Sequence, residues 1–262
     1  MEIELRIGDR LPVVASAQVL LKKFVDRDLR VTGFFDSFTQ KAILKIKTPQ
    51  YNRSSGTTIS GRVWSFLLQS SKLKVIDVID GADPAQGSTI STIRYYQSDY
   101  AGEHMIIKRA SSNSIGDVMK EITKFAPPFS LLLLRFHGHG APGYQGVSCG
   151  QTYSPKEKNS INIDYINDIT LDLQTLCPCF APFGSVELHG CKTGKDQKGA
   201  QLLQKLADLW QIPVSAGTKL QVSGGMGAAT FRFEGNPVSK MPSGQTLTKW
   251  ATSLQHSHMS IR

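Results

Sequence analysis

The chain has 262 residues, of which 40% are apolar and 19% charged, and this composition excludes a disordered or collagen-like protein. Its length allows one large domain or two small ones. The 30 Lys and Arg residues exceed the 21 Asp and Glu residues, and the net charge of +9 indicates an anionic partner. Four cysteines are too few for a scaffold built on disulfides, and no apolar run reaches the roughly 20 residues that span a bilayer.

The first residues bear on where the protein is made. Met1 to Arg6 alternate acidic and apolar side chains, and they lack the basic start and apolar stretch of a secretory signal. We therefore expect synthesis in the cytoplasm without a Sec-type signal, so that any export needs a specialised secretion system.

Residues 13–69 predict three short helices joined by turns that contain glycine. Apolar side chains between residues 15 and 25 follow a helical period. Asp36 or Ser37 can cap a second helix, and residues 63–68 suit a third.

The order of residues in this region resembles a peptidoglycan-binding-like domain. A glycine, an apolar pair and a helix-opening Thr stand at residues 33–39, and a glycine turn precedes Trp64. The resemblance implies a small helical domain at residues 1–70 that binds peptidoglycan. In the alternative interpretation, Phe34, Phe35 and Trp64 are ordinary core residues, because aromatic side chains dominate small cores.

From residue 71 onward the pattern changes to strands that alternate with helices. The predicted strands are 73–79, 104–110, 130–136, 184–188 and 212–216, and the predicted helices are 115–125, 163–176 and 197–210. This alternation predicts, for residues 71–262, an α/β fold with a mostly parallel sheet and helices on both faces. In such sheets, sites form at the carboxyl ends of the strands.

Two of the predicted strands end in residues suited to nucleophilic catalysis. Strand 130–136 is followed by His-Gly-His-Gly at residues 137–140, and strand 184–188 is followed by His-Gly-Cys at residues 189–191. If the strands are neighbours, a histidine and a cysteine lie side by side at one sheet edge. A thiol needs a base or a cationic neighbour to react as thiolate, and glycines leave amide N–H groups free to stabilise an oxyanion.

These motifs resemble the signature of the caspase-like cysteine peptidases, an apolar strand ending in His-Gly and a second strand ending in a small residue and Cys. The resemblance covers roughly residues 73–235. It implies a caspase-like fold and a peptidase with Cys191 as nucleophile and His139 as base, while His137 ends its strand and faces the sheet. It also implies that the amides of Gly140 and Cys191 hold the oxyanion. The substrate would be a protein or peptide, and no cofactor is implied.

Other interpretations of the same residues stay open. His137, His139, His189 and Cys191 form two i, i+2 pairs that could bind zinc in a zinc-dependent hydrolase. An unreactive Cys191 would make the chain a binding module without activity. The same His-Cys dyad could instead cleave peptidoglycan peptides.

The remaining charged residues are expected to play lesser parts. Asp80, Asp83 and Asp164 are plausible neighbours of the site, but we expect them to be solvated. Glu187 could orient a base or be an edge residue, and we expect the second. No basic cluster interleaved with aromatic residues supports nucleic-acid binding.

Taken together, the patterns and the two resemblances imply a two-domain cysteine peptidase that acts at the bacterial envelope. Residues 1–72 hold 12 Lys and Arg against 6 Asp and Glu, so they carry +6 of the +9 and suit an anionic wall. An antibacterial effector delivered by a specialised secretion machine, or a phage-type lytic protein, would combine these features.

Overall fold

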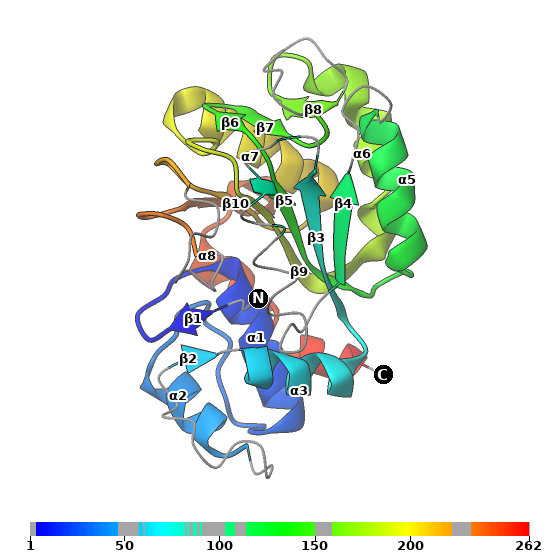
Figure 1. Cartoon of the computed structure of the whole chain (residues 1–262). Coiled ribbons are helices and arrows are strands. Elements are labelled where there is room, and N and C mark those ends of the chain that lie inside the picture. The colour runs from blue at the N-terminus through cyan, green and yellow to red at the C-terminus, as the bar shows by residue number, and fades with distance from the viewer. Residues whose placement is uncertain are drawn as a thin grey trace.

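The structure is a computed structural model that describes residues 4–46, 58–59, 61–81, 83, 86–87, 90, 103–107, 114–149, 159–221 and 232–261. Figure 1 shows two parts of the chain in contact. The blue and cyan N-terminal helices lie in the lower half, together with the red C-terminal segment. The main sheet and the green to yellow helices that pack on it fill the upper half.

The three helices predicted for the N-terminal region are present, with bounds close to the expected ones. They are α1 (Pro12–Phe24), α2 (Ser37–Leu44) and α3 (Gly61–Ser71), and the short strands β1 (Leu5–Arg6) and β2 (Thr58–Ile59) pair beside them. Pro12 begins α1, where its missing N–H costs no helical hydrogen bond. The Asp36 carboxylate caps α2 by accepting hydrogen bonds from the amides of Phe38 and Thr39 at 3.1 and 2.9 Å, as the sequence predicts.

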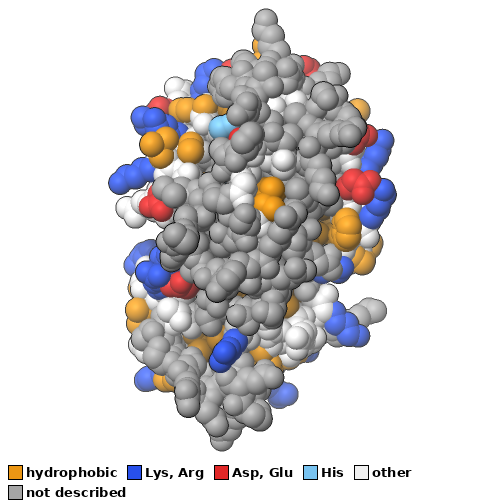
Figure 2. All heavy atoms as spheres, viewed as in Figure 1, with side chains coloured by type: hydrophobic (Ala, Val, Ile, Leu, Met, Phe, Trp, Pro, Cys, Tyr) orange, Lys and Arg blue, Asp and Glu red, His pale blue; other side chains and the backbone are white. Residues whose placement is uncertain are grey.

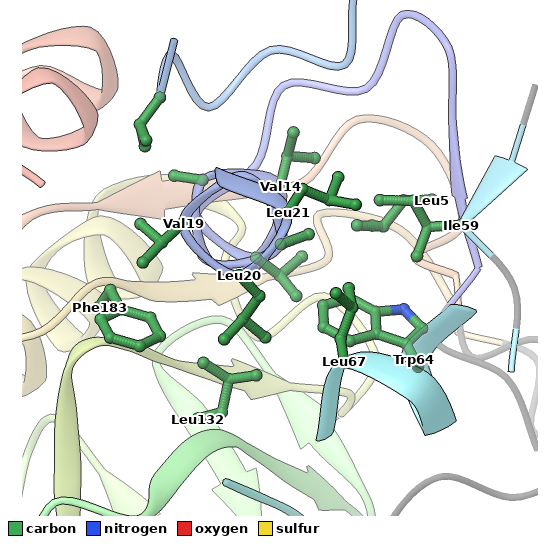
Figure 3. Packing of buried hydrophobic residues seen from close by; sticks show 14 of the residues in the cluster. Leu5, Val14, Val19, Leu20, Leu21, Ile59, Trp64, Leu67, Leu132 and Phe183 are labelled. Atoms are coloured by element: carbon green, nitrogen blue, oxygen red, sulfur yellow. The ribbon is translucent and has the colours of Figure 1, made fainter. Parts of the chain in front are cut away.

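Helix α1 is buried on nearly all sides and joins the N-terminal helices to the main sheet. The Ser16 hydroxyl donates a hydrogen bond to the Phe183 carbonyl at 2.6 Å, which ties α1 to a central strand. In Figure 3, Leu20 lies between Phe183 and Leu132 of the sheet on one side and Trp64 of α3 on the other. The predicted division at residue 70 therefore falls inside a shared hydrophobic core.

The main sheet has six strands in the order β11-β10-β9-β5-β3-β4. Five neighbouring strands, from β10 to β4, run parallel, and the edge strand β11 is antiparallel to β10. Their bounds are β3 (Lys74–Asp80), β4 (Glu103–Ile107), β5 (Leu131–His137), β9 (Phe180–Leu188), β10 (Val214–Ala216) and β11 (Val238–Lys240). The prediction of an α/β fold with a mostly parallel sheet is confirmed.

Helices cover both faces of this sheet. On one face α5 (Ile115–Phe125), α6 (Thr170–Gln174) and α7 (Asp196–Trp210) pack on Ile76, Leu134 and their neighbours. Alternate strand residues point to opposite faces, so Val75 and Leu133 face the other way and join the core around α1. Further along the strands this second face changes from apolar to polar.

One predicted element is wrong. The segment 163–176 is not a single helix but a 3₁₀ helix, η4 (Ile166–Ile169), followed by the short α6. The amide of Ile163 donates to the Gly143 carbonyl at 2.9 Å, and that of Tyr165 donates to Asn162 at 3.1 Å. Because Ile163 is tied to the loop after β5 and Tyr165 to the end of β8, the helical segment begins only at residue 166.

The remaining elements are short. A three-stranded sheet follows β5 and contains β6 (Gly140–Ala141), β7 (Tyr144–Gly146) and β8 (Ser160–Asn162). Short helices precede β9 and end the chain, namely η5 (Cys177–Cys179), η6 (Pro242–Gly244), α8 (Leu247–Ser253) and η7 (Ser257–Ser260). No helix in the described part of the chain is long and apolar enough to cross a membrane.

Candidate active site

The two strands that carry the predicted motifs are neighbours in the sheet. Strands β5 and β9 pair in parallel, with Phe136 opposite Leu188, so both motifs leave the sheet at the same edge. The strand order also reverses beside β5, because β3 and β4 lie on one side of it and β9 and β10 on the other. Such a reversal opens a crevice outside the carboxyl ends of the strands, where ligands bind in open α/β sheets.

The backbones of the two motif loops touch. A Cβ atom placed on Gly140 would lie 2.4 Å from the carbonyl carbon of Gly190 and 2.5 Å from the amide nitrogen of Cys191. Only glycine allows this approach, which explains the residue type at position 140. The structure therefore brings Gly140 and Cys191, the two predicted oxyanion donors, into contact through their backbones.

Hydrogen bonds hold the two loops together. The buried Gln145 side chain of β7 accepts a bond from the Gly190 amide at 2.8 Å and donates one to the Gly146 carbonyl at 2.8 Å. The Thr193 hydroxyl donates to the Tyr144 carbonyl at 2.9 Å. These clamps were missed in the sequence, because no motif marks Gln145 or Thr193 as partners of residues 45 and 49 positions away.

His139 pairs with an acidic residue that follows β3. Its ring Nε2 lies 3.3 Å from the Asp83 carboxylate, and 42% of the His139 side chain is exposed while only 1% of Asp83 is. The expectation that Asp83 and Asp80 are solvated is therefore wrong, since both are buried. Because β3 lies next to β5, the turn after β3 places Asp83 beside the histidine, where it can orient the ring.

The Cys191 thiol lies in a sharp turn and is partly exposed. The Gln221 amide donates a hydrogen bond to its sulfur at 3.3 Å, and the next residue, Lys192, has a left-handed φ of 59°. Among the described residues, no hydrogen bond joins the His139 ring to the Cys191 sulfur. Catalytic hydrogen bonds are often loose before substrate binds.

The thiols of the other three cysteines are poorly suited to form thiolates. Burial raises the pKa of the Cys149, Cys177 and Cys179 thiols, which disfavours their thiolate forms. Cys177 and Cys179 also lie at the opposite end of β9 from Cys191.

A buried ionic network lies below the motif loops. Arg135 of β5 donates two hydrogen bonds to the Asp77 carboxylate of β3, at 2.6 and 2.8 Å, and all of these groups are inaccessible to solvent. His137 ends β5 and lies 2.8 Å from the same carboxylate. Although burial alone would raise the pKa of Asp77, the nearby Arg135 and the His137 ring outweigh it and lower that pKa.

The network makes stability depend on pH. Burial is the main cause that lowers the pKa of His137, from 6.5 to about 4. The unfolded state therefore binds a proton that the folded state rejects between these pH values, and folding weakens as the pH falls through this window. We expect the free energy of unfolding to drop by about 3 kcal/mol from pH 7 to pH 4, an estimate based on the pKa shift.

Urea unfolding at several pH values checks this expectation. The variant His137→Gln keeps a group that can donate a hydrogen bond to Asp77 but cannot titrate, so its stability should change less across the window. An equal slope in both proteins would assign the pH dependence to other groups.

One further sequence expectation is corrected here, and another is confirmed. Glu187 is not an edge residue, because β9 is flanked by β5 and β10, and the side chain is buried and lies 3.0 Å from the His189 ring. Asp164 is half-exposed, as expected, and its carboxylate pairs with Lys198 at 2.7 Å.

The residues of the zinc alternative have other partners. His137 contacts Asp77 and stacks on His189 with 4.9 Å between ring centroids, whereas His139 contacts Asp83. In the part of the chain that the structure describes, no three His, Cys, Asp or Glu side chains are arranged to hold a metal ion.

No protein-family model matches this chain, and comparisons with the curated proteins and with the solved structures find no significant similarity.

Proposed function

We propose that this chain is a cysteine-dependent peptidase with Cys191 as nucleophile and His139 as general base. One observation carries the proposal. The loops that follow two adjacent parallel strands present these residues at one sheet edge, and their backbones touch at Gly140 and Gly190. Both side chains are also partly open to solvent, as a nucleophile and base that meet a substrate must be.

The proposed reaction follows from these positions. His139 takes the proton of the Cys191 thiol, and the thiolate attacks the carbonyl carbon of a peptide bond. The amides of Gly140 and Cys191 donate hydrogen bonds to the oxyanion that forms. His139 then gives the proton to the leaving amine, and water attacks the thioester, which releases the acid and restores the thiol. Asp83 is a positioning residue that orients the His139 ring.

The finer fold assignment belongs to the same proposal. We assign the sheet to the caspase-like type on the two motifs that end β5 and β9. The parallel sheet, with its order reversing beside β5, is compatible with that assignment.

A role for the N-terminal helices at the bacterial envelope is also proposed. The support is the excess of basic residues in positions 1–72. Trp64 and Phe35 are wholly buried and hold the core together, so a glycan would have to contact other residues, among them Phe38, which is 66% exposed. Figure 2 shows Lys and Arg side chains over both halves of this face rather than in one cluster.

Alkylation of the native chain tests the peptidase proposal. A thiol paired with a base forms thiolate near neutral pH, so iodoacetamide should modify Cys191 before the other cysteines. Peptide mapping by mass spectrometry locates the label, and cleavage of fluorescent casein is followed in the same samples. We expect activity to fall in proportion to the labelling of Cys191.

The partner histidine gives a second readout. His139→Ala should slow the labelling of Cys191 at pH 7, whereas His256→Ala, an exposed histidine near the C-terminus, should leave it unchanged. Labelling that occurs first at another cysteine, or full labelling of Cys191 without loss of cleavage, would refute the proposal.

A further inference from the structure

A pocket of about 420 Å³ lies beside the polar face of the sheet. Its walls come from three places in the chain. They are the N-terminal segment from Glu4 to Leu11, the side chain of Glu187 on β9, and the segment from Arg232 to Pro237. No sequence motif marks this pocket.

An ion pair holds two of these walls together. Both terminal nitrogens of the Arg232 guanidinium donate to the Asp9 carboxylate, each at 2.8 Å, and one of them also donates to the Glu4 carbonyl at 3.2 Å. The charges of Arg232 and Asp9 are therefore satisfied within the wall. The N-terminal segment is thus part of the pocket.

Glu187 places a buried negative charge in this pocket. Only 7% of its side chain is exposed, and one carboxylate oxygen lies 3.0 Å from the His189 ring. Among the described residues, no hydrogen bond reaches the other oxygen. A buried carboxylate that is only partly satisfied favours a cationic partner.

An aromatic ring lies on another side of the pocket. Phe233 stacks on His189 with 4.5 Å between centroids and 7° between planes, and His189 in turn stacks on His137. This stack fixes the Phe233 ring close to the residue that binds Glu187. A carboxylate next to an aromatic ring is a pairing that recognises organic cations.

The other charged side chains at the pocket do not supply this cation. Arg10 is exposed and lies over the Phe34 ring, 4.6 Å from its centroid, and Arg232 is bound to Asp9. The Glu4 carboxylate contacts the exposed Arg6. Glu187 is therefore the buried charged residue of the pocket whose second carboxylate oxygen can accept a ligand.

We propose that this pocket binds the guanidinium or ammonium end of a basic side chain, with Glu187 as its counter-charge and Phe233 as its aromatic wall. The ligand is either a free amino-acid derivative or a basic residue inside a peptide, since both offer the same group. The site does not depend on the peptidase proposal, because binding here needs no reaction at Cys191.

Calorimetric titration of the full chain tests the proposal with argininamide and with its neutral isostere citrullinamide. We expect argininamide to bind at least ten times more tightly than citrullinamide. Glu187→Gln, which keeps an acceptor for His189, should weaken argininamide binding at least ten-fold. The control variant is Glu121→Gln, which removes an exposed carboxylate that pairs with Lys124 on α5. It should leave the affinity for argininamide unchanged.

A second variant and a second probe complete the test. Phe233→Leu keeps an apolar side chain but removes the aromatic face, and should weaken binding several-fold. A capped Ala-Ala-Arg-Ala-Ala peptide that binds as well as argininamide would identify a peptide as the ligand, whereas binding of argininamide alone would identify a free derivative. Equal binding of citrullinamide and argininamide, or unchanged binding in Glu187→Gln, would overturn the proposal, while loss of peptide cleavage alone would not affect it.

Discussion

Replacing Cys191 with alanine is expected to lower the rate of peptide cleavage by at least about 10³-fold, because removal of the nucleophile leaves only binding and oxyanion contacts. The change deletes one sulfur from a partly exposed turn. The Gly140–Gly190 contact and the Gln145 side chain both hold the backbone of this turn, so the fold should be kept. Cleavage of fluorescent casein, and of the chain itself on gels, measures the loss.

The matched control is Cys177→Ala. Cys177 is also partly exposed, but it precedes β9 at the opposite end of the strand, where its thiol contacts the Leu209 carbonyl at 3.4 Å. This variant should keep full activity. If the Cys191 variant retains cleavage while its circular dichroism is native, the peptidase proposal is wrong.

Replacing Asp77 with alanine is expected to lower the free energy of unfolding by about 3–5 kcal/mol, the usual cost of removing one partner from a buried ion pair. Arg135 would then stay buried without its Asp77 counter-charge, since both side chains are fully inaccessible. His137 would lose its contact with the Asp77 carboxylate as well. Urea unfolding at pH 7 measures the change.

Two comparisons make this expectation sharp. Asp164→Ala removes an exposed carboxylate paired with Lys198, and such surface pairs contribute only about 0–1 kcal/mol. The double variant Asp77→Leu with Arg135→Leu removes both charges, so it should recover much of the loss because no unpaired charge remains. Similar losses for Asp77→Ala and Asp164→Ala would show that the buried pair does not stabilise the fold.

Local patterns in the sequence predict the elements best where one segment contains all the information. Helix α5 has the predicted bounds, because its apolar period and its Ser114 cap are both local. The segment 163–176 was predicted wrongly because its start is fixed by a hydrogen bond to Gly143, 20 positions away along the chain. A helical period cannot report such a distant contact.

The candidate site divides in the same way. The strand-terminal motifs place His139 and Cys191 after the carboxyl ends of two strands. These strands are neighbours, which is the condition on which the predicted dyad depends. The sequence offers Asp83 as a plausible site neighbour but favours a solvated residue, because nothing in a polar loop shows which strand lies beside it. Only the pairing of β3 with β5 brings Asp83 to 3.3 Å from His139.

By itself, the sequence determined the α/β class, most element positions and the two motifs, since these depend on periodicity and on residues close together in the chain. The tertiary structure decided the shared core across residue 70, the Gln145 clamp and the partner of Arg135. It also decided the pocket that joins Glu187 to the N-terminal segment. Each of these joins residues far apart in the chain, and their contact depends on strand register and order, which no local pattern encodes.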